Sequence, residues 1–180
     1  MTSLQTRKLT YAALFLALAL VLPFLTGQIP EIGKMLSPMH IPVLLCGFLC
    51  GWPWGLAVGF IAPLLRSVLF GVPVMFPGAV AMAFELAVYG GMTGFLYHVL
   101  PRKLWAVYLT LILSMIAGRL VWGAVQAALA GISRNSFTMD LFLKGAVTEA
   151  IPAIVLQIVL IPILVIAMER TGLCLNRQEH

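Results

Sequence analysis

The sequence predicts an all-α, polytopic membrane protein: a single six-transmembrane-helix bundle with its N and C termini in the cytoplasm. Composition is the first reason. Of 180 residues, 62% are hydrophobic and 9% are charged, whereas a soluble domain carries about 25% charged residues. The second reason is length, because several apolar stretches reach about 18 residues or more, enough to cross a bilayer. The third is the net charge of +5, which is explained by basic residues at membrane ends rather than by a nucleic-acid-binding surface.

The first span is predicted at about residues 8–25. Arg7 and Lys8 precede it, and Ala17-Leu18-Ala19 lies within it, so the segment has features of a signal peptide with a small-residue cleavage site. The apolar run continues beyond that site to Leu25, which favours a helix that is retained in the protein.

The remaining spans are predicted at about residues 41–50, 54–70, 79–99, 104–130 and 141–168. The second is short, with Pro42 at its start and Gly51-Trp52-Pro53 at its end. The third follows that turn directly. The fourth comes after the Pro- and Gly-rich loop GVPVMFPG, the fifth is the longest and is expected to be tilted, and the sixth closes the chain. Since no internal repeat or low-complexity segment interrupts residues 1–180, they are expected to form one domain.

The distribution of basic residues predicts the orientation. An even number of spans puts both termini on one side of the membrane. That side would hold six basic residues, and the other would hold three: Arg7, Lys8, Arg102, Lys103, Arg170 and Arg177, against Lys34, Arg134 and Lys144. Under the positive-inside rule the termini are therefore cytoplasmic. The loops 26–40, 71–78 and 131–140 then face outward.

Four charged residues lie inside the apolar spans: Arg66, Glu85, Arg119 and Glu149. A charge in the bilayer core costs several kcal/mol unless it faces a partner or a wet cavity. In the predicted orientation all four lie in the outer half, on four different helices and with two of each sign. They are therefore expected to line one polar cavity that opens outward. The alternative is a pair of buried salt bridges that only hold helices together.

Polar and aromatic neighbours extend the same helix faces. Tyr89 lies one turn after Glu85, and Trp122 and Gln126 follow Arg119 at helical spacing. This mixture suits a small polar ligand with a ring or an amide, although Trp122 by itself is more typical of packing. His40 begins the second span and is expected at the outer surface. It is either an interfacial histidine or, beside the long loop 26–40, part of a cavity lid.

The sequence lacks the motifs of a catalytic or metal site. It has no HExxH, no GxSxG and no Gly-rich phosphate loop, so neither an enzyme nor a cofactor is predicted. Cys46 and Cys50 lie four apart in an apolar helix and are interpreted as small core residues rather than a metal pair. Without a nucleotide-binding module, the chain cannot hydrolyse ATP by itself.

Two stretches carry a resemblance to a known family. The basic beginning TRKLTYAALFLALALVL contains Ala13-x-x-x-Ala17, and MHIPVLLCGFLCGWPWGL runs from Met39 to Leu56. With its length, six spans and cytoplasmic termini, the chain resembles a substrate-binding S component of an energy-coupling factor (ECF) vitamin transporter of the riboflavin/pantothenate type. Trp52-Pro53-Trp54 departs from the charged or polar residue expected in the inner turn.

The resemblance implies a function and a set of partners. An S component in the bacterial plasma membrane captures a small water-soluble vitamin from outside, and pantothenate is the best candidate here. It then associates with a transmembrane coupling subunit and two ATPase subunits. Ala13 and Ala17 match the motif that docks the coupling subunit, because small residues let helices approach closely in lipid. From the residues alone, packing of these alanines within the bundle is equally consistent.

Two other classes of function stay open. One is a stand-alone secondary transporter of a small polar metabolite, in which Glu85 or Glu149 takes up protons. The other is a membrane enzyme or assembly factor that transports nothing. Uptake that requires ATPase subunits indicates an S component of an ECF transporter. Uptake by the lone chain that depends on the proton gradient indicates the secondary transporter.

Overall fold

The computed structural model describes residues 3–26, 38–101, 103–133, 150–171 and 174–175. Over these residues the protein is all-helical, without a strand, as predicted. The elements in chain order are α1 (Ser3–Val21), the 3-10 helix η1 (Leu22–Thr26), α3 (His40–Cys50), α4 (Trp52–Phe70), the π-helix η2 (Met75–Ala79), α5 (Val80–Val99), α6 (Leu104–Ser133) and α8 (Ile151–Arg170).

Five segments of the described chain are long and apolar enough to cross a membrane: Leu4–Phe24, Trp52–Phe70, Met75–Val99, Leu104–Gly131 and Ile151–Arg170. The apolar helix α3 has 11 residues, which corresponds to about 16 Å, roughly half the hydrocarbon thickness of a bilayer. The predicted count of six spans includes this short helix and stays a prediction, as does the orientation of the termini.

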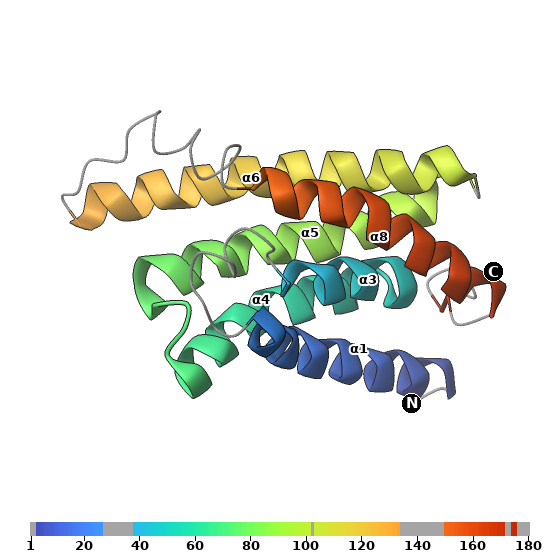
Figure 1. Ribbon diagram of the computed structural model, residues 1–180, viewed down its shortest axis with the longest axis horizontal. Helices are drawn as coiled ribbons and strands as arrows, with labels where there is room; N and C mark the ends of the chain where they lie inside the picture. Colours follow the sequence, from blue (N-terminus) through green and yellow to red (C-terminus); the bar gives the residue numbers. More distant parts are fainter. Residues whose placement is uncertain (1–2, 27–37, 102, 134–149, 172–173, 176–180) are drawn as a thin grey trace.

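The helices lie side by side along the long axis of the molecule, and the beginning of α1 and the end of α8 lie at the same end (Figure 1). We call this end the inner end, after the predicted orientation, and the opposite end the outer end. Helix α5 lies centrally and packs against α3, α4 and α6, while α3 is enclosed by α1, α4, α5 and α8. All residues of α3 are buried.

Glycines bring α4 and α5 into backbone contact. A Cβ atom added at Gly55 would overlap the carbonyl oxygen of Gly90, and one added at Gly90 would overlap that of Gly55. Gly59 approaches Leu86 in the same way one turn further along α4. Small residues allow such close approach between membrane helices, where lipid supplies no hydrophobic driving force. This contact fixes the position of α5, which carries Glu85 and Tyr89.

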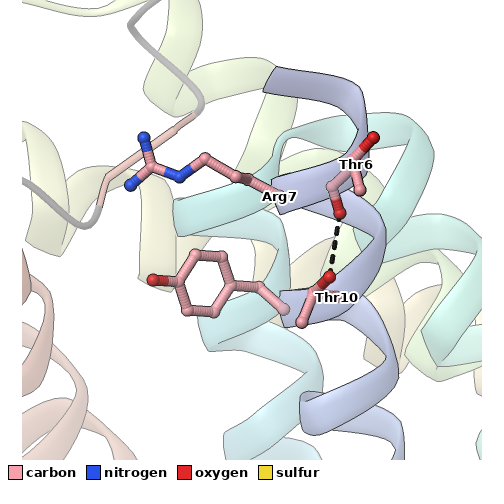
Figure 2. Close-up of a pocket in the computed structure, with 4 residues that line it drawn as sticks. Thr6, Arg7 and Thr10 are labelled. Carbon is pink, nitrogen blue, oxygen red and sulfur yellow. Dashed lines mark hydrogen bonds between the residues drawn. The ribbon is translucent and has the colours of Figure 1, made fainter. Parts of the chain in front are cut away.

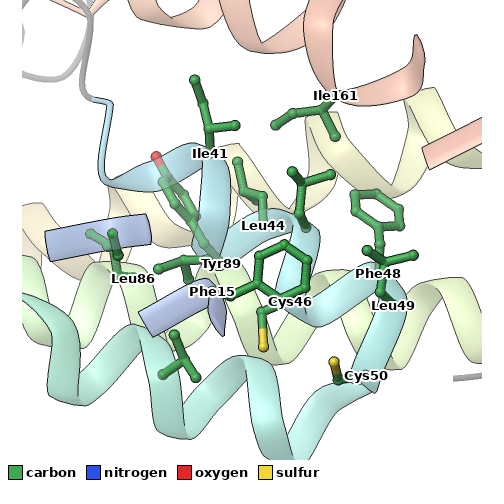
Figure 3. Close-up of a cluster of buried hydrophobic side chains, with 14 of the residues drawn as sticks. Phe15, Ile41, Leu44, Cys46, Phe48, Leu49, Cys50, Leu86, Tyr89 and Ile161 are labelled. Carbon is green, nitrogen blue, oxygen red and sulfur yellow. The ribbon is translucent and has the colours of Figure 1, made fainter. Parts of the chain in front are cut away.

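The apolar core surrounds α3 (Figure 3). Phe48 packs edge-on against Tyr97 of α5, with ring centroids 5.0 Å apart, and Ile161 of α8 is directed onto α3. Cys46 and Cys50 are free thiols buried in this core, as the sequence predicts. Most of α3 is therefore surrounded by other side chains, and its beginning at His40 lies inside the protein.

Candidate functional site

An ion pair between α5 and α6 forms the centre of the candidate site. Nη1 of Arg119 lies 3.1 Å from Oε1 of Glu85, and the two side chains are 18% and 2% exposed. The contact is close but does not have hydrogen-bond geometry, so Glu85 Oε1 and Arg119 Nε have no hydrogen-bond partner among the described residues. The structure thus brings together two of the four predicted charges, Glu85 and Arg119, and each of them keeps a buried atom without a hydrogen-bond partner among the described residues.

His40 contributes a third ionisable group. Its Nε2 lies 3.7 Å from Oε1 of Glu85, and neither ring nitrogen has a hydrogen-bond partner within the described part of the chain. The expectation of a histidine at the outer surface is wrong, because His40 is only 3% exposed. The reason is the shortness of α3, which begins inside the bundle rather than at its outer end.

Tyr89 completes the group. It lies one helical turn after Glu85, is buried, and its hydroxyl lies beside both Glu85 and Arg119. Its ring centroid is 5.4 Å from that of His40. The ring also covers the backbone of Gly118, where an added Cβ would overlap it, so the glycine before Arg119 makes room for the aromatic ring. We call His40, Glu85, Tyr89 and Arg119 the polar cluster.

A buried amide is not among the predicted site residues. Gln157 of α8 is 2% exposed, and its Oε1 has no hydrogen-bond partner among the residues that the structure describes. The sequence does indicate Gln157 as a candidate site residue, because its lone amide interrupts the apolar run IPAIVLQIVLIPILVIAM. Polar residues inside membrane helices are characteristically functional.

Arg66 is buried in a different environment from the polar cluster. It donates a hydrogen bond to the carbonyl oxygen of Leu20 at the end of α1. Its guanidinium carbon also lies 5.1 Å from the ring centroid of Phe24 and 5.4 Å from that of Phe70, both within cation–π range. These contacts join the outer ends of α1 and α4 and explain why the charge is tolerated there.

The other predicted site residues lie further along α6 or outside the described residues. Trp122 and Gln126 are half-buried on α6, about one and two turns beyond Arg119. Glu149 lies outside the described residues. The structure therefore gathers His40, Glu85, Tyr89 and Arg119, and within the described ranges no contact joins Arg66 to them.

Ala13 and Ala17 lie on the outer face of α1. Both are exposed, whereas Ala12, Phe15 and Ala19 of the same helix are buried. The two small residues thus face away from the described bundle.

Nearer the inner end, a surface pocket of about 430 Å³ is lined by Thr6, Arg7, Thr10 and Tyr11 (Figure 2). Thr10 Oγ1 donates to the Thr6 carbonyl oxygen over 3.0 Å, so its hydroxyl is satisfied within the helix.

A second pocket, of about 320 Å³, lies at the inner end, away from the polar cluster. Its lining residues come from α5, α6, α8 and the turn before α6: Tyr97, Lys103, Leu104, Val107, Ile166, Glu169 and Arg170. The Tyr97 hydroxyl donates to the Glu169 carboxylate and so ties α5 to α8. The described residues contain no group of three or more side chains suited to hold a metal ion.

Comparison with known proteins gives one match. The family model described as "ECF transporter, substrate-specific component" matches residues 7–167, a range that includes the polar cluster, Gln157 and the exposed alanines of α1. No curated protein and no solved structure matches the chain.

Proposed function

Because the chain belongs to the substrate-specific components of ECF transporters, a family of transporter subunits rather than enzymes, we propose that it is the high-affinity substrate-binding subunit of an ATP-driven importer. Its substrate is a small water-soluble vitamin captured from outside, with pantothenate as the first candidate. The chain is a multi-pass protein of the bacterial plasma membrane, with six spans when α3 is counted and with cytoplasmic termini.

The observation that carries this proposal is the unsatisfied hydrogen-bonding capacity of the polar cluster. Buried polar groups in proteins are nearly always hydrogen-bonded, and each unmet donor or acceptor costs about 1–3 kcal/mol. Among the described residues, His40, Glu85 and Arg119 all have buried atoms without such a partner. A salt bridge that served only to join α5 and α6 would explain the ion pair but not these remaining atoms. A bound solute would satisfy them.

The cluster suits a solute with both acidic and donor groups. Arg119 carries guanidinium donors that match a carboxylate, and Glu85 accepts from hydroxyl or amide groups. Tyr89 and His40 add aromatic walls. Pantothenate has a carboxylate, two hydroxyls and an amide, so it matches this set. Trp122, Gln126 and Glu149 are proposed as further contacts toward the outer end, whereas the predicted contact Arg66 is engaged by Leu20, Phe24 and Phe70.

The energy for uptake is proposed to come from a partner module with a transmembrane coupling subunit and two ATPase subunits. The exposed Ala13 and Ala17 support this, because small residues on an outer helix face permit the close approach of a partner helix in lipid. The sequence carries no nucleotide-binding motif, which fits a division of labour between the binding subunit and an external motor.

Native mass spectrometry of the purified chain tests the substrate, because a tightly bound solute is released as a defined mass. Pantothenate uptake into vesicles is then measured with and without co-expressed ATPase subunits. We expect uptake only with the ATPase subunits. Uptake by the lone chain that stops when the proton gradient is abolished would instead indicate a secondary carrier, and the absence of any bound solute would contradict a binding subunit.

A further inference from the structure

Gln157 is the buried polar residue of α8 whose role the polar cluster does not explain. Its side chain is 2% exposed, and its Oε1 has no hydrogen-bond partner in the described part of the structure. It is the one strongly polar side chain between Ile151 and Met168. An amide that serves only to fill space is readily replaced by Leu or Met, without the cost of an unmet acceptor.

Helix α8, which carries Gln157, packs against α3, the helix that begins at His40 of the polar cluster. Helices α3 and α8 are in contact and run in the same direction along the bundle (Figure 1). Ile161 is directed from α8 onto α3 and shares the core with Leu44 (Figure 3). One helical turn toward the outer end from Ile161 is Gln157, and one turn in the same direction from Leu44 is His40.

We propose that Gln157 is a specificity-determining contact of the substrate, with its side-chain oxygen accepting a hydrogen bond from an N–H or O–H group of the solute. This inference rests on the proposed binding function. The acidic end of the solute lies against Arg119 of α6, and its donor end lies against Gln157 of α8. The substrate class is therefore a small hydroxy- or amido-carboxylate that carries its carboxylate and its donor groups at opposite ends.

The first test is pantothenate binding by isothermal titration calorimetry with the full chain in nanodiscs. Gln157→Leu, which keeps the side-chain volume but removes the acceptor, is expected to weaken binding by about 10- to 100-fold. Gln157→Glu keeps an acceptor oxygen at the same reach and is expected to recover part of the loss. Ile161→Val, one turn away in the same helix, controls for repacking and is expected to bind as wild type does.

Three analogues of pantothenate identify the donor. Each lacks one donor group: the primary hydroxyl, the secondary hydroxyl or, by N-methylation, the amide N–H. If Gln157 accepts from one of them, removal of that group and Gln157→Leu affect the same hydrogen bond, and their effects on Kd do not add. Fully additive effects for all three analogues, or wild-type affinity in Gln157→Leu, would overturn the inference.

Thermal unfolding without added solute separates this inference from the proposed function. If only a solute donates to the Gln157 oxygen, the empty protein has no hydrogen bond there to lose. The Tm of Gln157→Leu is therefore expected to equal or exceed that of the wild type. A Tm lower by about 2 °C or more would mean that Gln157 has a structural partner, which overturns the inference. If the wild type binds no pantothenate, the assignment of pantothenate as the substrate fails. Native mass spectrometry then tests the role of Gln157 separately, because a solute that co-purifies with wild type but not with Gln157→Leu supports that role.

Discussion

Glu85 of α5 and Arg119 of α6 approach to 3.1 Å inside the apolar bundle, yet both keep buried atoms without a hydrogen-bond partner among the described residues. An ion pair that only stabilised the fold would be expected to satisfy these atoms, because a half-satisfied buried network is less stable than an apolar core. The unpaired atoms of these two residues therefore favour the proposed binding site over a purely structural contact.

Replacement of Arg119 by Ala is expected to weaken pantothenate binding by about 2–5 kcal/mol, the usual loss when one member of a buried charged contact is removed. Titration calorimetry on the folded, monodisperse variant measures it. Lys103→Ala removes a positive charge from the inner-end pocket and is the matched control, with affinity expected to be unchanged. An Arg119→Ala variant that folds and binds like wild type would contradict the proposed site.

Replacement of both partners separates stability from binding. Glu85→Leu combined with Arg119→Met removes both charges, and apolar replacements of a buried ion pair are often neutral or stabilising by about 1–4 kcal/mol. We expect the double variant to unfold at the wild-type temperature or above, measured by thermal unfolding in detergent, while pantothenate binding is lost. Each single variant leaves one charge unpaired and should unfold earlier. Binding that survives in the double variant would favour a structural ion pair.

Enlargement of the exposed alanines is expected to affect uptake but not binding. Ala13→Trp and Ala17→Trp add bulk to the outer face of α1 and would keep a partner helix at a distance. Affinity for pantothenate should stay within about threefold, which is under 1 kcal/mol, while uptake and co-purification with the ATPase subunits are abolished. Ile163→Trp, at an exposed position of α8, is the control and should transport normally. Normal uptake by Ala17→Trp would refute the docking face.

Two adjacent glycines of α5 give a matched test of the fold. A Cβ at Gly90 would overlap the backbone of Gly55, whereas one at Gly91 would meet Leu56 Cβ at an ordinary 3.5 Å. Gly90→Ala is therefore expected to lower the free energy of unfolding by about 2 kcal/mol or more, because the backbones of α4 and α5 have to separate. Gly91→Ala should be neutral or stabilising by up to about 1 kcal/mol. Equal thermal stability of the two variants would mean that the helices do not touch at Gly55 and Gly90.

Hydropathy predicts the five long apolar helices of the described residues, because apolar runs long enough to cross a bilayer have few alternatives to the α-helix. The first part of the predicted span 141–168 lies outside the described residues. Hydropathy also identified Glu85 and Arg119, since charges inside such runs stand out in any membrane sequence. The close glycine contact was not predicted, although Gly55-x-x-x-Gly59 and Gly90-x-x-x-Gly94 are visible. Such pairs are informative only when the facing helix is known.

Two features of the site depend on tertiary arrangement and could not be read from local patterns. The depth of His40 follows from where α3 begins within the bundle, whereas its position beside a long loop suggested the surface. The surroundings of Arg66 depend on the end of α1, which supplies the Leu20 carbonyl and the Phe24 ring. Spacing along a single helix gives no information about which neighbouring helix supplies such partners.

The packing on the inner side of the polar cluster bears on the direction in which a solute can leave. Phe48, Tyr97 and Leu111 are almost completely buried there, and Tyr97 fastens α5 to α8 through Glu169. We therefore expect a solute at the cluster to be retained on this side for as long as the contact between α5 and α8 persists. Its release toward the inner end would require these packed side chains to separate.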